Sequence, residues 1–273
     1  MNLAVPSLDL NVAPAWQARL ALDFQRRDAA TILARREHFG PLRVQKALYP
    51  EGEGVCHVIV LHPPSGIAGG DDLHIGVKVD AGAHALLTTP GAGKWYRSAG
   101  PWAKQRLDFA VGADATLEWL PQENIVFDAA RADMQSRIEL DAAARFIGMD
   151  VLCLGRRASG ETFAHGALQL DTRVQRGGQP IWLERGRLDA AGRRAAHRTR
   201  IARRLPGGAA AGKRCAVWHY AAARSAGGAL SGACVGSRAA LVFCFVAAAA
   251  SRADRARRAD AAHLEHLRQT RWN

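Results

Sequence analysis

Three carboxylates follow turn-like residues at a fixed distance and could together compensate the charge of a cation. Each lies six positions after a Gly or Ala that we take as the anchor of a loose repeat, with steps of 30, 32 and 34 residues between anchors. The anchors are Gly82, Gly112, Ala144 and Gly178, and the residues six positions later are Thr88, Glu118, Asp150 and Glu184. Inward-facing carboxylates would repel one another, and burial would raise their pKa unless a cation or hydrogen bonds compensate. Solvated, outward-facing side chains are the alternative.

A second group of acids closes a constrained loop, His62 to Asp72. Two prolines in this loop fix φ, and three glycines permit left-handed conformations. The loop separates two strand-like runs and ends in Asp71 and Asp72. Taken alone, this pattern favours a tight turn with solvated acids.

Other motifs point away from familiar catalysts. The segment from Pro90 to Trp95 resembles a phosphate-binding loop, but it lacks the first Gly and the Ser or Thr after Lys94 that the Walker pattern requires. We interpret Lys94, Trp95, Tyr96 and Arg97 as an exposed aromatic and basic patch that contacts a partner protein. The histidines form no ligand pair on one element, and no nucleophile elbow is present.

The elements that must position these residues are mostly strands. Alternation of apolar and polar residues begins at Trp16 and recurs up to about residue 190, with one short helix expected from Arg157 to His165. The loose repeat favours stacked β units, although an ordinary β-sandwich stays open on this reasoning. The fold class is therefore mostly β, with few short helices and an atypical Ala/Arg-rich C-terminal segment.

Charge divides the chain at about residue 190. Residues 193–273 hold 16 Lys and Arg against 3 Asp and Glu, which accounts for all of the net charge of +12 because the remainder is nearly neutral. We therefore expect a β domain over residues 1–190 and a divergent basic tail over residues 191–273. The tail is interpreted as aberrant, for example through a shifted reading frame, or as disordered, with a genuine basic arm as the alternative.

Cysteine usage and hydropathy indicate the compartment. The chain has five cysteines without CxxC spacing, which favours reduced thiols. The N-terminus has no signal-peptide pattern, and the apolar run from Ala239 to Ala250 is too short to span a bilayer. A cytoplasmic protein is the expectation.

The chain resembles the UreD family of urease accessory proteins, called UreH in some organisms. Many specific segments match in one order over roughly residues 16–190. They include Trp16 to Leu20, Gly40 to Gln45, Tyr49 to Gly52, Cys56-His57, Leu61 to Pro64, Gly66 to Asp71, Thr89 to Ser98, Leu117 to Glu123, Asp150 to Arg156 and Gly160 to Gly166.

This resemblance implies a non-enzymatic maturation factor with stacked sheets of helical-β, solenoid-like character. A member of the family docks on apo-urease (UreA, UreB and UreC) and, with UreF and the GTPase UreG, helps to deliver nickel to the urease active site. No tightly bound cofactor is implied, only nickel in transit. The expected partners are these proteins, with neither nucleic acid nor membrane.

The resemblance also implies an internal nickel path lined by acidic and polar groups. The matching positions are Asp71, Asp72, Asp150 and Glu184, with Glu118, Glu123 and Glu161 as additions. Weak oxygen ligands suit a metal that must pass on, because tight His or thiolate sites would trap it.

Two other functions stay open at this point. One is a β-solenoid-like hydrolase that uses an acid pair such as Glu118 and Asp150. The other is a protein that binds nucleic acid through its basic tail.

Overall fold

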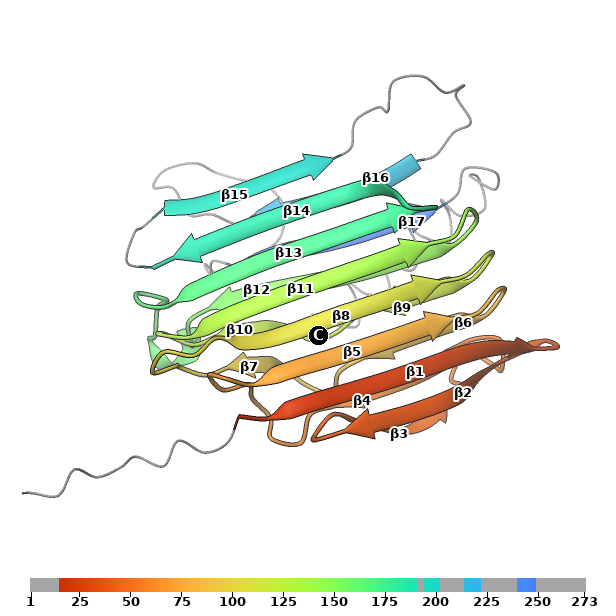
Figure 1. Cartoon of the computed structure of the whole chain (residues 1–273), viewed down its shortest axis with the longest axis horizontal. Coiled ribbons are helices and arrows are strands. Elements are labelled where there is room, and N and C mark those ends of the chain that lie inside the picture. The colour runs from red at the N-terminus through yellow and green to blue at the C-terminus, as the bar shows by residue number, and fades with distance from the viewer. Residues whose placement is uncertain (1–14, 191–193, 202–213, 222–239, 249–273) are drawn as a thin grey trace, which may run out of the picture.

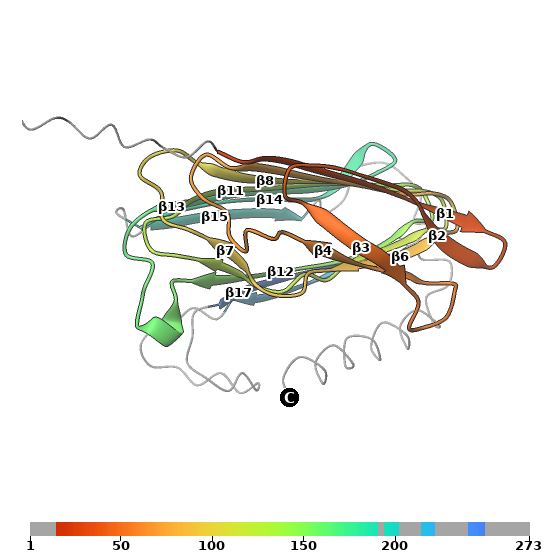
Figure 2. The ribbon, with the colours of Figure 1, turned by 90° about the horizontal axis from the view of Figure 1, so that it is seen from below.

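Two β-sheets pack face to face and form nearly all of the part of the chain that the structure describes (Figures 1 and 2). A computed structural model describes residues 15–190, 194–201, 214–221 and 240–248, and the side chains of residues 15–190 except that of Arg157. Within these ranges the one helical element is a single 3-10 turn, η1 (Arg157–Ser159). The prediction of a mostly β protein is confirmed, whereas the helix expected from Arg157 to His165 shrinks to this turn.

The first sheet has eight strands and faces the viewer in Figure 1. In spatial order they are β15 (Arg194–Ile201), β14 (Gln179–Asp189), β13 (Ala167–Arg176), β11 (Arg131–Leu140), β8 (Ala103–Val111), β5 (Asp72–Val79), β1 (Gln17–Arg27) and β2 (Ala30–Phe39).

The second sheet has nine strands. Its main path runs β16 (Arg214–Ala221), β17 (Ala240–Ala248), β12 (Arg145–Leu154), β9 (Thr116–Trp119), β6 (His84–Thr88), β4 (Cys56–Leu61) and β3 (Arg43–Leu48). Two short strands lie off this path: β10 (Asn124–Val126) pairs in parallel with both β12 and β7 (Gly93–Trp95).

From β4 to β13 the chain passes repeatedly from one sheet to the other, so it winds as a flattened β-helix. Successive passes place β5, β8, β11 and β13 side by side in parallel in the first sheet. The intervening β4, β6, β9 and β12 are likewise parallel in the second sheet. Each strand can bury its apolar face only against the opposite sheet. The stacked, solenoid-like arrangement predicted from the sequence is therefore confirmed.

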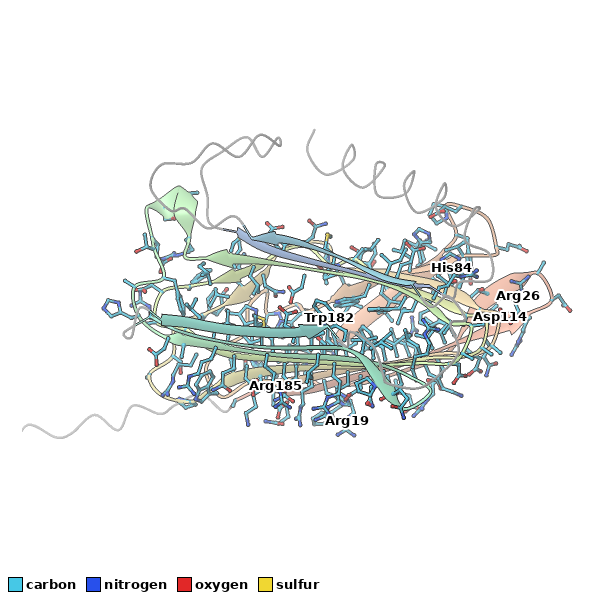
Figure 3. The ribbon with its side chains drawn as sticks, turned by 90° about the horizontal axis from the view of Figure 1, so that it is seen from above. Arg19, Arg26, His84, Asp114, Trp182 and Arg185 are labelled. Atoms are coloured by element: carbon cyan, nitrogen blue, oxygen red, sulfur yellow. The ribbon has the colours of Figure 1, made fainter. Side chains whose placement is uncertain are left out.

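The core lies between the sheets because each strand turns alternate residues inward. The inward side chains of β5 are Leu73, Ile75, Val77 and Val79. Each of them is 4% exposed or less. Phe109 of β8 meets Trp119 of β9 edge-on, with ring centroids 5.5 Å apart, which marks the inner faces of the two sheets. In Figure 3, Trp182 lies between the layers, while Arg19 and Arg185 project from the outer face.

The turns between the sheets stack as the repeat predicted, and the turns from β5 to β6, from β8 to β9 and from β11 to β12 each have four residues, but the anchors stand at different positions within them. Gly112 donates to the carbonyl of Val79 and Asp141 donates to that of Val111, so equivalent turns stack one on another. The strands that follow begin two residues after Gly82, four after Gly112 and one after Ala144. A fixed offset of six positions therefore does not mark equivalent residues.

The observed register corrects the predicted equivalence of the carboxylates. Glu118 pairs with Leu86 on one side and with Ile147 on the other, so Asp150 lies three positions beyond the equivalent site. Glu184 follows the anchor Gly178, but that turn joins β13 to the antiparallel β14 within the first sheet. The three acids therefore do not form one row.

Strands also occur beyond residue 190, where the Ala/Arg composition gave no reason to expect them. β15 pairs with β14, and β17 pairs with β12 and with β16, all antiparallel. The rest of the predicted tail lies outside the described residues. No helix in the described part of the chain is long and apolar enough to cross a membrane.

The loop from His62 to Asp72 is held against β7 and the residue that follows it. Ile67 donates to the carbonyl of Lys94, and the N–H of Tyr96 donates back to that of Ile67. Gly66 is required by packing, since a Cβ there would lie 2.1 Å from the ring of Tyr96. The glycines of this loop thus permit a close approach of two segments, in addition to turning the chain.

Candidate functional site

Asp150 reaches the interior from β12. Phe146 on the same strand contacts Phe109 of the first sheet, with ring centroids 6.3 Å apart, which marks the inner face of β12. Alternation places Asp150, four residues later, on that face. Its Oδ1 accepts a hydrogen bond of 3.0 Å from Nδ2 of Asn124. Oδ1 of Asn124 in turn accepts one of 3.1 Å from Nε1 of Trp95.

Glu184 faces the same interior from the opposite sheet. It lies on β14 two residues after Trp182, and these two side chains are 2% and 1% exposed. Trp182 lies between the layers, which fixes the direction of this face of β14 (Figure 3). The negative charge of Glu184 acts on Asp150 directly. The interior therefore holds two interacting carboxylates that come from different sheets.

The pKa of Asp150 is raised to about 6 by this environment. Burial is the largest cause, and the charge of Glu184 adds to it, while the hydrogen bond from Asn124 opposes both. Two carboxylates that face each other in an apolar layer are unfavourable when both are ionised. A divalent cation would offset their charges, and carboxylate oxygens are ligands that hard and borderline cations accept.

Asp150 and Glu184 offer too few ligands to form a tight metal site. Within the described side chains, no group of three or more His, Cys, Asp or Glu residues is arranged to hold a metal ion. Asp150 and Glu184 offer oxygen ligands, without the imidazole or thiolate groups that retain transition metals most firmly. The arrangement suits brief contact with a cation better than storage of one.

Asp71 is buried, but its carboxylate is used to build the loop. It is 2% exposed, and its two oxygens accept hydrogen bonds of 2.8 Å from the backbone N–H groups of Trp16 and Ala68. Burial lowers the pKa of the nearby His62, which favours the neutral imidazole, and the charge of Asp71 partly opposes this effect. The turn pattern predicted a solvated acid, and this prediction is wrong for Asp71.

Asp72 points to the other side of the sheet. Its carboxylate accepts two hydrogen bonds from Nη2 of Arg106, at 2.7 and 2.6 Å, and Arg106 is exposed on β8. The neighbouring Leu73 is in the core, so Asp72 lies on the outer face. The prediction that Asp72 lines an interior path is wrong because strand alternation directs consecutive residues to opposite faces.

Glu118 also faces away from the interior, although it is only 5% exposed. Its neighbours Leu117 and Trp119 belong to the core, so Glu118 lies on the outer face of the second sheet. There its Oε1 lies 2.7 Å from Nε2 of His84. The prediction that Glu118 joins an interior path is wrong for the same reason as for Asp72.

This geometry also separates Glu118 from Asp150, the acid pair considered as an example for a hydrolase. Glu118 lies on the outer face of the second sheet, whereas Asp150 lies on its inner face. Paired carboxylates must flank one substrate bond to act as acid and base. Glu118 and Asp150 cannot do so from opposite faces of a sheet.

The patch predicted to contact a partner is only partly on the surface. Trp95 is fully buried, so its assignment as an exposed contact is wrong. Tyr96 is partly buried and packs edge-on against Phe127 at 5.2 Å between centroids. Arg97 is exposed and Lys94 is partly exposed, and a contact role for these two residues stays a prediction.

Glu161 contributes to a surface ion pair. It accepts hydrogen bonds from Arg156 and from the backbone N–H of Asp128, and Arg156 is the main cause of its lowered pKa. Glu123 is partly buried, and its backbone carbonyl accepts from the N–H of Gly93. Neither residue joins the Asp150–Glu184 pair through a contact found in the described structure.

Sequence reasoning missed Asn124 and the role of Gly93. Asn124 lies opposite Gly93 in the parallel pairing of β10 with β7. A Cβ on Gly93 would lie 2.6 Å from Oδ1 of Asn124, so glycine leaves room for the amide. In the sequence, the glycines before Lys94 suggest only a phosphate-binding loop, which the Walker pattern excludes. The pairing that gives Gly93 its role joins two three-residue strands, which no local pattern reveals.

Comparison with known proteins gives one consistent family. A family model described as UreD urease accessory protein matches residues 17–273. The chain is 60% identical over 191 residues to the urease accessory protein UreD of Dechloromonas aromatica (strain RCB), which covers 70% of this chain and 66% of the relative. It is 55% identical over 179 residues to the protein of the same name in Azoarcus sp. (strain BH72), which covers 66% and 63%. For the one from Ralstonia nicotianae, the identity is 54% over 176 residues, which covers 64% and 60%. The chain thus spans slightly less than two thirds of the length of these relatives.

Proposed function

Because the chain belongs to the UreD urease accessory protein family, we propose that it acts in urease maturation as a non-enzymatic factor. It binds apo-urease, composed of UreA, UreB and UreC, and works with UreF and UreG to deliver nickel to the urease active site. The urease accessory proteins to which it is similar support the maturation role. The cytoplasm is the proposed place of action.

The observation that carries the nickel part of this proposal is the interacting pair Asp150 and Glu184. These carboxylates belong to different sheets and both point into the interior, where the charge of Glu184 acts on Asp150 and burial raises the pKa of Asp150 to about 6. A divalent cation that enters the interior meets two oxygen donors there and relieves their repulsion. The interior between the sheets is therefore the proposed route.

The small number of protein ligands that Asp150 and Glu184 provide is suited to the delivery of nickel. A site with three or more protein ligands would hold nickel firmly and slow its release. Conduction requires binding that is strong enough for entry and weak enough for exit. Two carboxylates supported by one amide meet this condition. No tightly bound cofactor is proposed.

Arg97 and Lys94 are the proposed contacts with a protein partner. Lys94 lies in the short strand β7 and Arg97 follows it, and both carry positive charge close to the partly buried Tyr96. Arginine and tyrosine are enriched in protein interfaces. An acidic surface on the partner would suit them.

Co-expression with apo-urease, UreF and UreG tests the proposal. We expect the tagged chain to capture these partners, and we expect Asp150→Ala and Glu184→Ala to leave capture intact while lowering nickel per urease active site. Asp72→Ala is the matched control, because Asp72 carries the same charge on the outer face. Failure of the folded wild-type chain to capture any partner would refute the maturation role. Normal nickel content with both interior variants would refute the route.

A further inference from the structure

We propose that Asn124 is a positioning residue, which holds the Asp150 carboxylate in the orientation that a passing nickel ion meets. Trp95 and Gly93 set the orientation of Asn124 itself. This inference rests on the proposed function, since it concerns how one side chain of the nickel route is kept in place.

Trp95 determines which end of the Asn124 amide faces which neighbour. The indole Nε1–H can only donate, so the atom that it contacts at 3.1 Å must be the amide oxygen. The amide nitrogen is then directed to Asp150. Trp95 is fully buried and therefore provides a fixed reference for the amide.

The amide nitrogen in turn selects one oxygen of Asp150. Nδ2 of Asn124 donates to Oδ1 at 3.0 Å. An amide NH₂ is a donor in every protonation state of its neighbour, so Oδ1 serves as the acceptor whether Asp150 is ionised or neutral. Oδ2 is the oxygen that this hydrogen bond does not occupy. A cation that reaches Asp150 thus meets a carboxylate with one oxygen already fixed.

Gly93 keeps the position of Asn124 open. The two residues are partners in the parallel pairing of β7 with β10, and Asn124 also pairs with Leu152 of β12. The short strand β10 is therefore held from both sides. A methyl group at position 93 would come within 2.6 Å of the amide oxygen and would displace it. Glycine at this position preserves the Trp95–Asn124–Asp150 chain of hydrogen bonds.

Fixing this carboxylate matters because Glu184 repels it. The hydrogen bond from Asn124 favours the ionised form of Asp150, in opposition to burial and to the charge of Glu184. Without Asn124, Asp150 would lose this hydrogen-bond donor and would be free to turn away from the opposing acid. Groups that orient metal ligands in this way are commonly worth one to two orders of magnitude in metal affinity or activity.

Nickel loading during co-expression with apo-urease, UreF and UreG tests the inference. Asn124→Leu removes both hydrogen bonds, and Asn124→Asp keeps an acceptor for Trp95 but removes the donor to Asp150. We expect both variants to slow nickel loading on the order of tenfold, with partner capture close to wild type. Gly93→Ala should act in the same direction without any change at Asn124. Gly91→Ala is its matched control, because a Cβ there meets nothing within 4 Å.

The double variant separates a positioning role from a general structural one. If Asn124 acts through Asp150, adding Asn124→Leu to Asp150→Ala should slow loading no further. A further slowing in the double variant would overturn the inference, as would normal loading by the Asn124 variants beside a slow Asp150→Ala. Normal loading by Asp150→Ala itself would instead overturn the proposed nickel route.

Discussion

Oδ1 of Asp71 accepts a hydrogen bond of 2.8 Å from the backbone N–H of Trp16, 55 residues away in sequence. The second carboxylate oxygen accepts from Ala68, inside the same loop. One buried carboxylate thus joins the start of β1 to the loop that precedes β5, where the two strands begin their parallel pairing. Asp71 therefore has a clear structural role, whatever it contributes to a metal.

Asp71→Asn should destabilise the fold. An amide keeps one acceptor oxygen but directs an NH₂ group at a backbone N–H, so one buried donor loses its partner. Hydrogen bonds to charged groups contribute roughly 1.5–3 kcal/mol, and we expect a loss of about 2–3 kcal/mol in the free energy of unfolding. Denaturant titration of the folded chain measures this change.

Asp72→Asn is the control for that experiment. Its ion pair with Arg106 is on the surface, where such pairs contribute about 0–1 kcal/mol. Equal losses for the two variants would show that Asp71 has no special role in closing the loop.

Gly66→Ala should also destabilise the chain, through packing alone. Its Cβ would overlap the ring of Tyr96 at 2.1 Å, and overpacking of this kind costs about 1–3 kcal/mol. Gly54→Ala provides the control, since the nearest atom there is 3.9 Å away. A shift in the melting temperature of Gly66→Ala no larger than that of Gly54→Ala would contradict the close approach of these segments.

The contribution of Asp150 to stability should fall as the pH rises from about 4 to about 6. An ordinary Asp has a pKa of about 3.9, so the unfolded chain releases this proton in that range while the folded chain retains it up to about 6. A raised carboxyl pKa therefore favours folding at low pH. The corresponding loss is at most about 3 kcal/mol at pH above 6.

Denaturant titrations of wild type and Asp150→Asn between pH 4 and pH 7 isolate this contribution. Asp128 and Glu161 have lowered pKa values and affect stability in the opposite direction, mainly below this range. These acids are unchanged in the variant, so the difference between the two proteins reports Asp150. Parallel curves for the two proteins would show that Asp150 is not desolvated.

The sequence predicted the fold class well because alternation is a local property. Each strand needs one apolar face, and this requirement is visible in β5 or β11 without knowledge of their neighbours. Register is different, because it depends on which residues of successive turns are equivalent. Gly82, Gly112 and Ala144 stand at different positions in turns of equal length, so a constant spacing from them misaligned Glu118 with Asp150.

Sequence reasoning predicted only part of the candidate site, and the cause is again that the register between strands is not visible in a local pattern. The interior location of Asp150 and Glu184 agrees with the path implied by family resemblance, although its use by nickel stays a prediction. The spacing that also singled out these acids did not reflect equivalent positions. Asn124 was missed because its two partners, Trp95 and Asp150, come from different strands and meet only in the folded sheet. Consecutive acids such as Asp71 and Asp72 were grouped, whereas alternation separates them.

Glu118→Gln should leave nickel delivery unchanged, whereas Glu184→Gln should lower it. Both acids are nearly fully buried, at 5% and 2% exposure, so burial alone does not distinguish them. They differ in direction, because Glu118 meets His84 on the outer face while Glu184 acts on Asp150 between the sheets. Nickel per urease active site, measured after co-expression with apo-urease, UreF and UreG, gives the comparison. Each variant should first be shown to capture its partners as wild type does. Equal losses of nickel would mean that buried charge in general supports delivery, and would contradict a route confined to the space between the two sheets.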